Sequence, residues 1–259
     1  MNRDRLKKLA ADKRFVPGIY NYCDRWCERC PKTSQCLNFS ISEEKFSDPQ
    51  VHDIRNEAFW KKLSEVLGET LELLREIAKE YEIDLENSGS MDDIEDIKAK
   101  DAATESHLLC RAAKSYSKMV EDWFGRKEKL LFEPAAVADE RMDLEEAFEV
   151  IRWYQYFIAA KVTRAIRGKM EEDEEGCDEF ASDSDGSAKI ALIALDRSIG
   201  AWAVILRYNH PNAEGVLEII SFLDRLRQAI EQTFPRARSF IRPGFDRIDL
   251  NAPGSDTEP

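Results

Sequence analysis

The chain has 259 residues, of which 43% are hydrophobic and 34% charged, and it contains 11 Gly and 9 Pro. This composition excludes collagen-like and wholly disordered chains, and the length suffices for one large domain or two small ones. The net charge of -13 at pH 7 has the wrong sign for a protein that coats nucleic acid or acidic membranes, so we expect neither as a general partner.

The N-terminus and the cysteines indicate a cellular compartment. The segment from Met1 to Lys13 is basic and lacks the apolar core of a signal peptide, and no later stretch reaches the roughly 20 apolar residues of a membrane span. We therefore expect a cytoplasmic protein. Because the cytoplasm keeps thiols reduced, six cysteines, four of them close together, indicate metal binding rather than disulfides.

Residues 1–42 are predicted to form a basic, cysteine-rich, metal-binding module. Residues 1–39 hold nine Lys or Arg against four Asp or Glu, a net charge of +5 that leaves -18 for the remaining chain. Four cysteines follow the pattern C-x3-C-x2-C-x5-C, and they are Cys23, Cys27, Cys30 and Cys36. Four thiolates at such short spacings can surround one tetrahedral zinc ion or a four-iron four-sulfur cluster. Exposed free thiols and a pair of disulfides are weaker explanations.

The last three cysteines, Cys27, Cys30 and Cys36, with Pro31 directly after Cys30, resemble the cluster loop of the endonuclease III and adenine-mismatch glycosylase family. The pattern of that loop is C-x6-C-x2-C-x5-C. The resemblance implies that Cys23, Cys27, Cys30 and Cys36 hold a four-iron four-sulfur cluster. It covers this loop alone, and the first spacing is three residues instead of six. No helix-hairpin-helix or catalytic residue of that family can be placed in the chain, so glycosylase activity is not implied.

The first three cysteines, C-x3-C-x2-C, also look like the motif of radical S-adenosylmethionine enzymes, in which one iron stays open to the cofactor. A fourth thiolate from Cys36 would occupy that iron, and the strands of the expected barrel have no counterpart in the sequence pattern. We therefore rank the four-iron four-sulfur cluster ahead of structural zinc and place radical chemistry third. Arg25, Arg29 and Lys32 would offset the negative charge of either four-thiolate site.

Residues 51–242 are predicted to form an all-α, antiparallel bundle of about five helices. Apolar residues recur at helical spacing over about 51–83, 91–124, 143–170, 187–209 and 213–234. The segment 171–187 has nine acidic residues and no basic one, which predicts a solvated, disordered loop. Cys177 within it is predicted to be a free thiol. Residues 243–259 are predicted to be a flexible C-terminal tail.

Three charged residues fall at apolar faces of the predicted helices. A helical-wheel count places Glu105 and Lys161 within apolar stripes and Asp196 at the border of another. Unpaired buried charges cost several kcal/mol each, so we expect Lys161 to pair with Glu105 or Asp196. The alternative is a polar pocket in which Glu105 is the acid or base and Tyr116 or Tyr154 is the donor.

Two functions follow from these patterns. The first is a metal-binding helical protein with a redox-responsive or interaction role, whose bundle presents a surface to a protein partner. The second is an enzyme with a polar pocket inside the bundle and a purely structural metal site. Four cysteines that saturate a metal leave no open coordination position, which favours the first.

Overall fold

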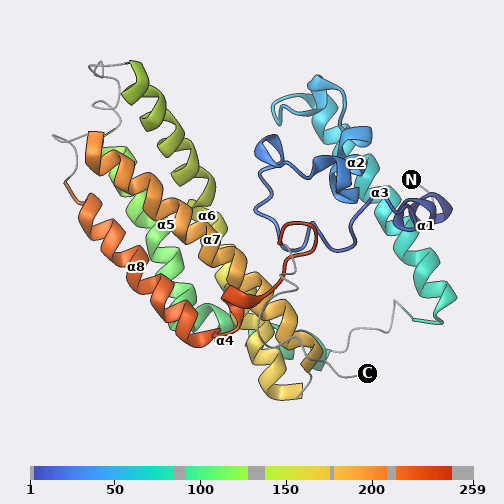
Figure 1. Cartoon of the computed structure of the whole chain (residues 1–259). Helices are drawn as coiled ribbons and strands as arrows, with labels where there is room; N and C mark the ends of the chain where they lie inside the picture. Colours follow the sequence, from blue (N-terminus) through green and yellow to red (C-terminus); the bar gives the residue numbers. More distant parts are fainter. Residues whose placement is uncertain (1–2, 85–90, 128–137, 176–177, 209–213, 247–259) are drawn as a thin grey trace, which may run out of the picture. The chain divides into compact units, whose positions relative to one another are not determined.

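The computed structural model describes residues 3–84, 91–127, 138–175, 178–208 and 214–246 (Figure 1). Within these ranges all regular secondary structure is helical, which confirms the predicted all-α fold. Contacts divide the chain into two compact units, residues 1–97 with 241–259 and residues 98–240. The sequence-based boundaries lie elsewhere, at 42, 51 and 242, since they assign the first long helix to the bundle.

The first unit consists of short helices joined by turns, followed by one long helix. In chain order its elements are α1 (Arg3–Ala10), η1 (Cys27–Arg29), η2 (Thr33–Gln35), α2 (Leu37–Lys45), η3 (Pro49–Val51) and α3 (Glu57–Glu80), and the start of α4 also belongs to it. Among the described residues of this unit, the buried apolar ones are Ile19, Val51 and Ala78. The hydrophobic core of the first unit is therefore small.

Helix α3 is amphipathic, and a row of apolar side chains along it is exposed to solvent. Trp60, Leu67, Leu71 and Leu74 are each more than half exposed. They recur at spacings of seven, four and three residues, which places them on one side of the helix. An exposed apolar stripe of this kind is unusual for a surface that meets only water.

The second unit is a bundle built around four long helices. Its elements are α4 (Met91–Ser106), α5 (Leu108–Lys127), α6 (Ala138–Glu175), α7 (Asp178–Tyr208), α8 (Val216–Thr233) and η5 (Ala237–Ser239). Helix α6 packs along α7, α7 against α8, α8 against α5, and α5 against α6. Successive helices of this ring run in alternate directions (Figure 1), as in an up-and-down four-helix bundle.

Aromatic side chains fill the centre of this bundle. The rings of Trp123 and Trp202 meet edge to face with centroids 4.9 Å apart, a favoured aromatic geometry. The Trp202 Nε1–H donates a hydrogen bond to the Tyr116 hydroxyl at 3.1 Å. Tyr116, Trp123 and Trp202 are all fully buried, so these contacts connect α5 to α7 inside the core.

The single helix predicted over 91–124 is two helices, α4 and α5, separated at His107. The His107 Nδ1 accepts a hydrogen bond from the Leu109 N–H at 3.2 Å, so this side chain caps the start of α5. Thr104 is buried whereas Ala102 is exposed. A helical wheel drawn for one continuous helix puts Ala102 in the same apolar stripe as Glu105. The break therefore changes which residues of α4 face inward.

The prediction of a solvated loop over 171–187 is wrong for the part that the structure describes. Residues 171–175 end α6 and residues 178–187 begin α7, while Cys177 lies outside the described residues. Acidic residues near the start of α7 are favourable because a helix N-terminus carries partial positive charge. Arginines also neutralise them: Arg164 pairs with Asp183 and Arg236 with Asp185, each at 3.0 Å.

Gly168 allows α6 and α7 to approach closely, because a Cβ at this position would lie 3.2 Å from the Ser184 Cβ. Both helices begin earlier than predicted. The predicted starts were residue 187 for α7 and Asp143 for α6, whereas the helices begin at Asp178 and Ala138.

In the described ranges, no helix combines the length and the apolar character that crossing a membrane requires.

Candidate metal centre

The four N-terminal cysteines line one cavity in the first unit. Its volume is about 20 Å³, and Cys23, Cys27, Cys30 and Cys36 contribute to its wall. None of these cysteines is in a disulfide. A space of this size accommodates about one water molecule or one ion. The four thiols therefore share one space in the folded loop.

The cavity is not a formed metal centre. Across the parts of the chain that the structure describes, no three His, Cys, Asp or Glu side chains are placed to hold a metal ion. All four cysteines nevertheless line the same cavity. The fold thus holds the four cysteines on short turns that follow one another in the chain.

The backbone of these turns points N–H groups at the sulfur atoms. The Lys32 N–H donates to the Cys30 Sγ and the Phe39 N–H to the Cys36 Sγ, each at 3.4 Å. The Cys23 Sγ itself donates a hydrogen bond to the Tyr20 carbonyl at 3.5 Å, and Arg25, two residues on, adopts a left-handed conformation with φ of 60°. Hydrogen bonds from N–H groups stabilise a thiolate more than a thiol, so these turns suit sulfur ligands that carry negative charge.

Cys36 also caps a helix. It occupies the N-cap position of α2, where its sulfur accepts a hydrogen bond from the N–H of Phe39, the third residue of that helix. Cys36 is thus both a helix cap and a candidate ligand.

The electrostatics of the cluster oppose ionisation when no cation is bound. Burial raises the pKa of the Cys23 thiol. Burial also raises the pKa of the Cys27 thiol, and the neighbouring sulfurs of Cys23, Cys30 and Cys36 raise it further. A bound cation reverses this balance, because it stabilises each thiolate and screens their mutual repulsion.

The rest of the cavity wall is largely apolar and aromatic. Ile19, Trp26, Phe39 and Phe245 contribute to it. The Arg29 guanidinium lies over the Trp26 ring, 4.1 Å from its centroid, a cation–π contact at the edge of the site. Apolar walls limit the access of water to a metal centre and influence its redox potential. The sequence analysis did not identify Phe39 as part of this site, and Phe245 falls in the segment 243–259 that was predicted to be a flexible tail.

Glu105 is not buried, contrary to the wheel count. Its side chain is 67% exposed and forms an ion pair with Lys114 at 3.2 Å. The ammonium of Lys161 lies 5.5 Å from the centroid of the Phe157 ring, and both of its predicted partners, Glu105 and Asp196, are exposed. The predicted buried pair is wrong because the helix break at His107 turns Glu105 toward solvent.

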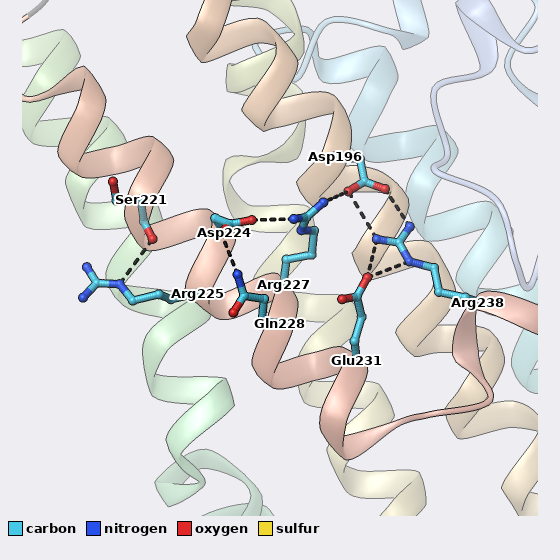
Figure 2. Close-up of polar contacts among 8 residues, drawn as sticks. All are labelled: Asp196, Ser221, Asp224, Arg225, Arg227, Gln228, Glu231 and Arg238. Carbon is cyan, nitrogen blue, oxygen red and sulfur yellow. Dashed lines mark hydrogen bonds and ion pairs between the residues drawn. The ribbon is translucent and has the colours of Figure 1, made fainter.

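Asp196 belongs instead to a network of ion pairs at the surface of the bundle (Figure 2). Its carboxylate binds Arg238 at 2.6 Å and Arg227 at 3.5 Å. Arg238 also pairs with Glu231 at 2.7 Å, and Arg227 with Asp224 at 2.5 Å. The network joins α7, α8 and the segment after α8, so its role in the structure is to brace these elements.

The two tyrosines considered as donors have structural partners. Tyr116 accepts the hydrogen bond from Trp202, and burial raises the pKa of Tyr116 to about 12. The Tyr154 hydroxyl accepts a hydrogen bond from Arg197. Glu105 and Asp196 are exposed, so the buried charges that suggested an active site inside the bundle are not present at these two positions.

No known protein family, no curated protein and no solved structure matches this chain.

Proposed function

We propose that the first unit binds a metal centre through the thiolates of Cys23, Cys27, Cys30 and Cys36, and that the protein has a redox-responsive or interaction role. The observation that carries the proposal is the common cavity lined by all four thiols. The N–H groups directed at two of the sulfurs add to it, because they favour charged sulfur ligands. Free thiols of this kind fit a reducing compartment such as the cytoplasm.

The first candidate for the metal is a four-iron four-sulfur cluster, for which the spacing of the cysteines is the support. Such clusters bind four cysteine thiolates, and their potential depends on hydrogen bonds to sulfur and on solvent exposure. The apolar wall and the N–H groups of this site are features of that kind. A cluster bound here would make the protein an electron carrier or a redox sensor.

The second candidate is a structural zinc ion, because four cysteine thiolates at these spacings also satisfy one tetrahedral zinc. Zinc with four cysteines is a closed, non-catalytic site whose binding energy stabilises the fold. In this case the first unit is an interaction module held together by its metal.

Either centre is saturated by protein ligands. Without an open position the metal cannot bind or polarise a substrate, which favours structure or electron transfer over catalysis. The interaction role has separate support in α3, where Trp60, Leu67, Leu71 and Leu74 are exposed on one side. Exposed apolar surface of this extent is typical of proteins that bind other proteins.

Anaerobic purification of the full chain, followed by an absorption spectrum and analysis of iron, sulfide and zinc, tests the proposal. A brown protein with a band near ~400 nm and iron bound by the four cysteines supports the cluster. A colourless protein with one equivalent of zinc supports the structural ion. Serine at any one of the four cysteine positions should lower the metal content, while Cys177→Ser should not. A protein that contains neither metal refutes the proposal.

A further inference from the structure

The wall of the thiol cavity includes a residue from the other end of the chain. Phe245 lines the cavity together with the four cysteines, although all other lining residues come from residues 19–39. It lies on the segment 241–246, which we call the C-terminal strap, and the strap belongs to the first compact unit. The site is therefore completed by the part of the chain that follows the helical bundle.

The strap has a defined turn that holds Phe245. The Arg242 guanidinium pairs with the Asp246 carboxylate at 2.8 Å, and the Arg242 backbone N–H donates to the same carboxylate at 2.9 Å. Backbone N–H groups of Phe245 and Asp246 donate to the Arg242 carbonyl at 3.2 and 3.1 Å. The guanidinium also lies over the Phe245 ring, 5.0 Å from its centroid. Several contacts thus position one aromatic ring.

The strap also packs tightly on the core of the first unit. Gly244 has a φ of 74°, a left-handed conformation that favours glycine. A Cβ at Gly244 would lie 2.8 Å from the Ile19 Cδ1 and 3.4 Å from the Val16 Cγ1. Ile19 is only 1% exposed and lines the thiol cavity as well. A Cβ at position 244 would therefore displace the Ile19 side chain that lines the cavity and would strain the left-handed backbone of the strap.

We propose that Phe245 is a positioning residue that closes the thiol cavity, with Gly244 allowing the close approach of the strap. The ring shields the sulfur atoms from water and from thiol reagents, and it maintains the apolar wall next to them. In the metal-bound protein the same closure slows loss of the metal. The effect on the metal rests on the proposed function, whereas the shielding of the thiols does not.

The test uses the full-length protein as purified under reducing conditions, and iodoacetamide as the probe. The rate of alkylation of the peptide containing Cys23 to Cys36 is followed by mass spectrometry. We expect Phe245→Ala and Gly244→Ala to raise this rate about tenfold, because local opening exposes the thiols. Phe245→Leu should restore most of the protection, since it refills the apolar wall, and such rescue is not expected from a change that only loosens the fold.

Two controls separate closure from general unfolding. Phe59→Ala removes a half-buried ring of the same unit that does not line the cavity, and it should leave the rate unchanged. Cys110, buried in the second unit, serves as an internal reference whose alkylation should stay constant in all variants. Wild-type rates in Phe245→Ala, or an equal rise in Phe59→Ala, would overturn the inference.

A second measurement follows release of metal from loaded protein to a chelator. Phe245→Ala should release it about tenfold faster than wild type, with helix content unchanged, if the ring protects the centre. A wild-type protein that takes up no metal refutes the proposed function but leaves the alkylation result to decide the role of the strap. Metal release at the wild-type rate from Phe245→Ala refutes the role of the ring in metal retention.

Discussion

The first unit is expected to depend on its metal for folding, and Cys27→Ser tests this dependence. Ile19 and Val51 are its largest buried apolar side chains, and burial of each contributes about 1.5–3 kcal/mol, so the pair contributes about 3–6 kcal/mol. A unit with so few buried apolar side chains has little stability unless another interaction contributes. Binding of a structural zinc contributes about 10–16 kcal/mol in small zinc modules at pH 7.

Removal of one thiolate should therefore unfold the cysteine segment and leave the second unit intact. Hydrogen exchange with mass spectrometry on the full chain measures the two separately. In Cys27→Ser we expect the amides of residues 16–46 to lose their protection, while those of α5, α6, α7 and α8 exchange as in the wild type.

Cys177→Ser is the matched control, because it makes the same chemical change outside the cluster. It should leave protection of residues 16–46 unchanged. If metal-free Cys27→Ser retained wild-type protection there, the reasoning would be refuted, since the small core would then suffice without a metal.

Three other outcomes are expected. Because burial raises the pKa of the Cys23 and Cys27 thiols, metal binding must displace their protons. Below these pKa values the affinity for zinc, measured by competition with a chelator, should rise by about 100-fold per pH unit from the two thiols alone. An affinity that does not change with pH would contradict the assignment. Tyr116→Phe strands the buried Trp202 N–H and should lower the free energy of unfolding in urea by about 1–3 kcal/mol, a prediction that fails if the midpoint does not move. Asp196→Ala removes exposed ion pairs and should cost at most about 1 kcal/mol in the same assay, whereas a larger loss would show that its network does more than brace the surface.

The helical class of the fold could be predicted from the sequence because it depends on local periodicity. Apolar residues at helical spacing indicated the long helices, and the structure contains α3, α6, α7 and α8 in those regions. The errors arose where local signals were ambiguous. A capping histidine at position 107 divides one predicted helix, and the acidic residues of 178–187 form helix since arginines distant in sequence neutralise them.

The candidate ligands were also available from the sequence, because four cysteines within one short loop must lie near one another whatever the rest of the chain does. Their spacing alone raised the choice between zinc and a four-iron four-sulfur cluster. The direction of backbone N–H groups at the sulfurs depends on the fold of the turns, including the left-handed Arg25, and no sequence pattern of the loop specified it.

Tertiary structure alone decided which distant residues complete the site and which charges lie in solvent. Phe245 reaches the thiol cavity because the strap folds onto Ile19, a contact between the two ends of the chain that leaves no periodic signal in either segment. Glu105 is exposed because a break in the helix changes its direction, and Asp196 meets Arg238 because α7 lies beside the segment after α8. Local residue patterns determine helices and clustered ligands, whereas these contacts depend on how the elements pack in three dimensions.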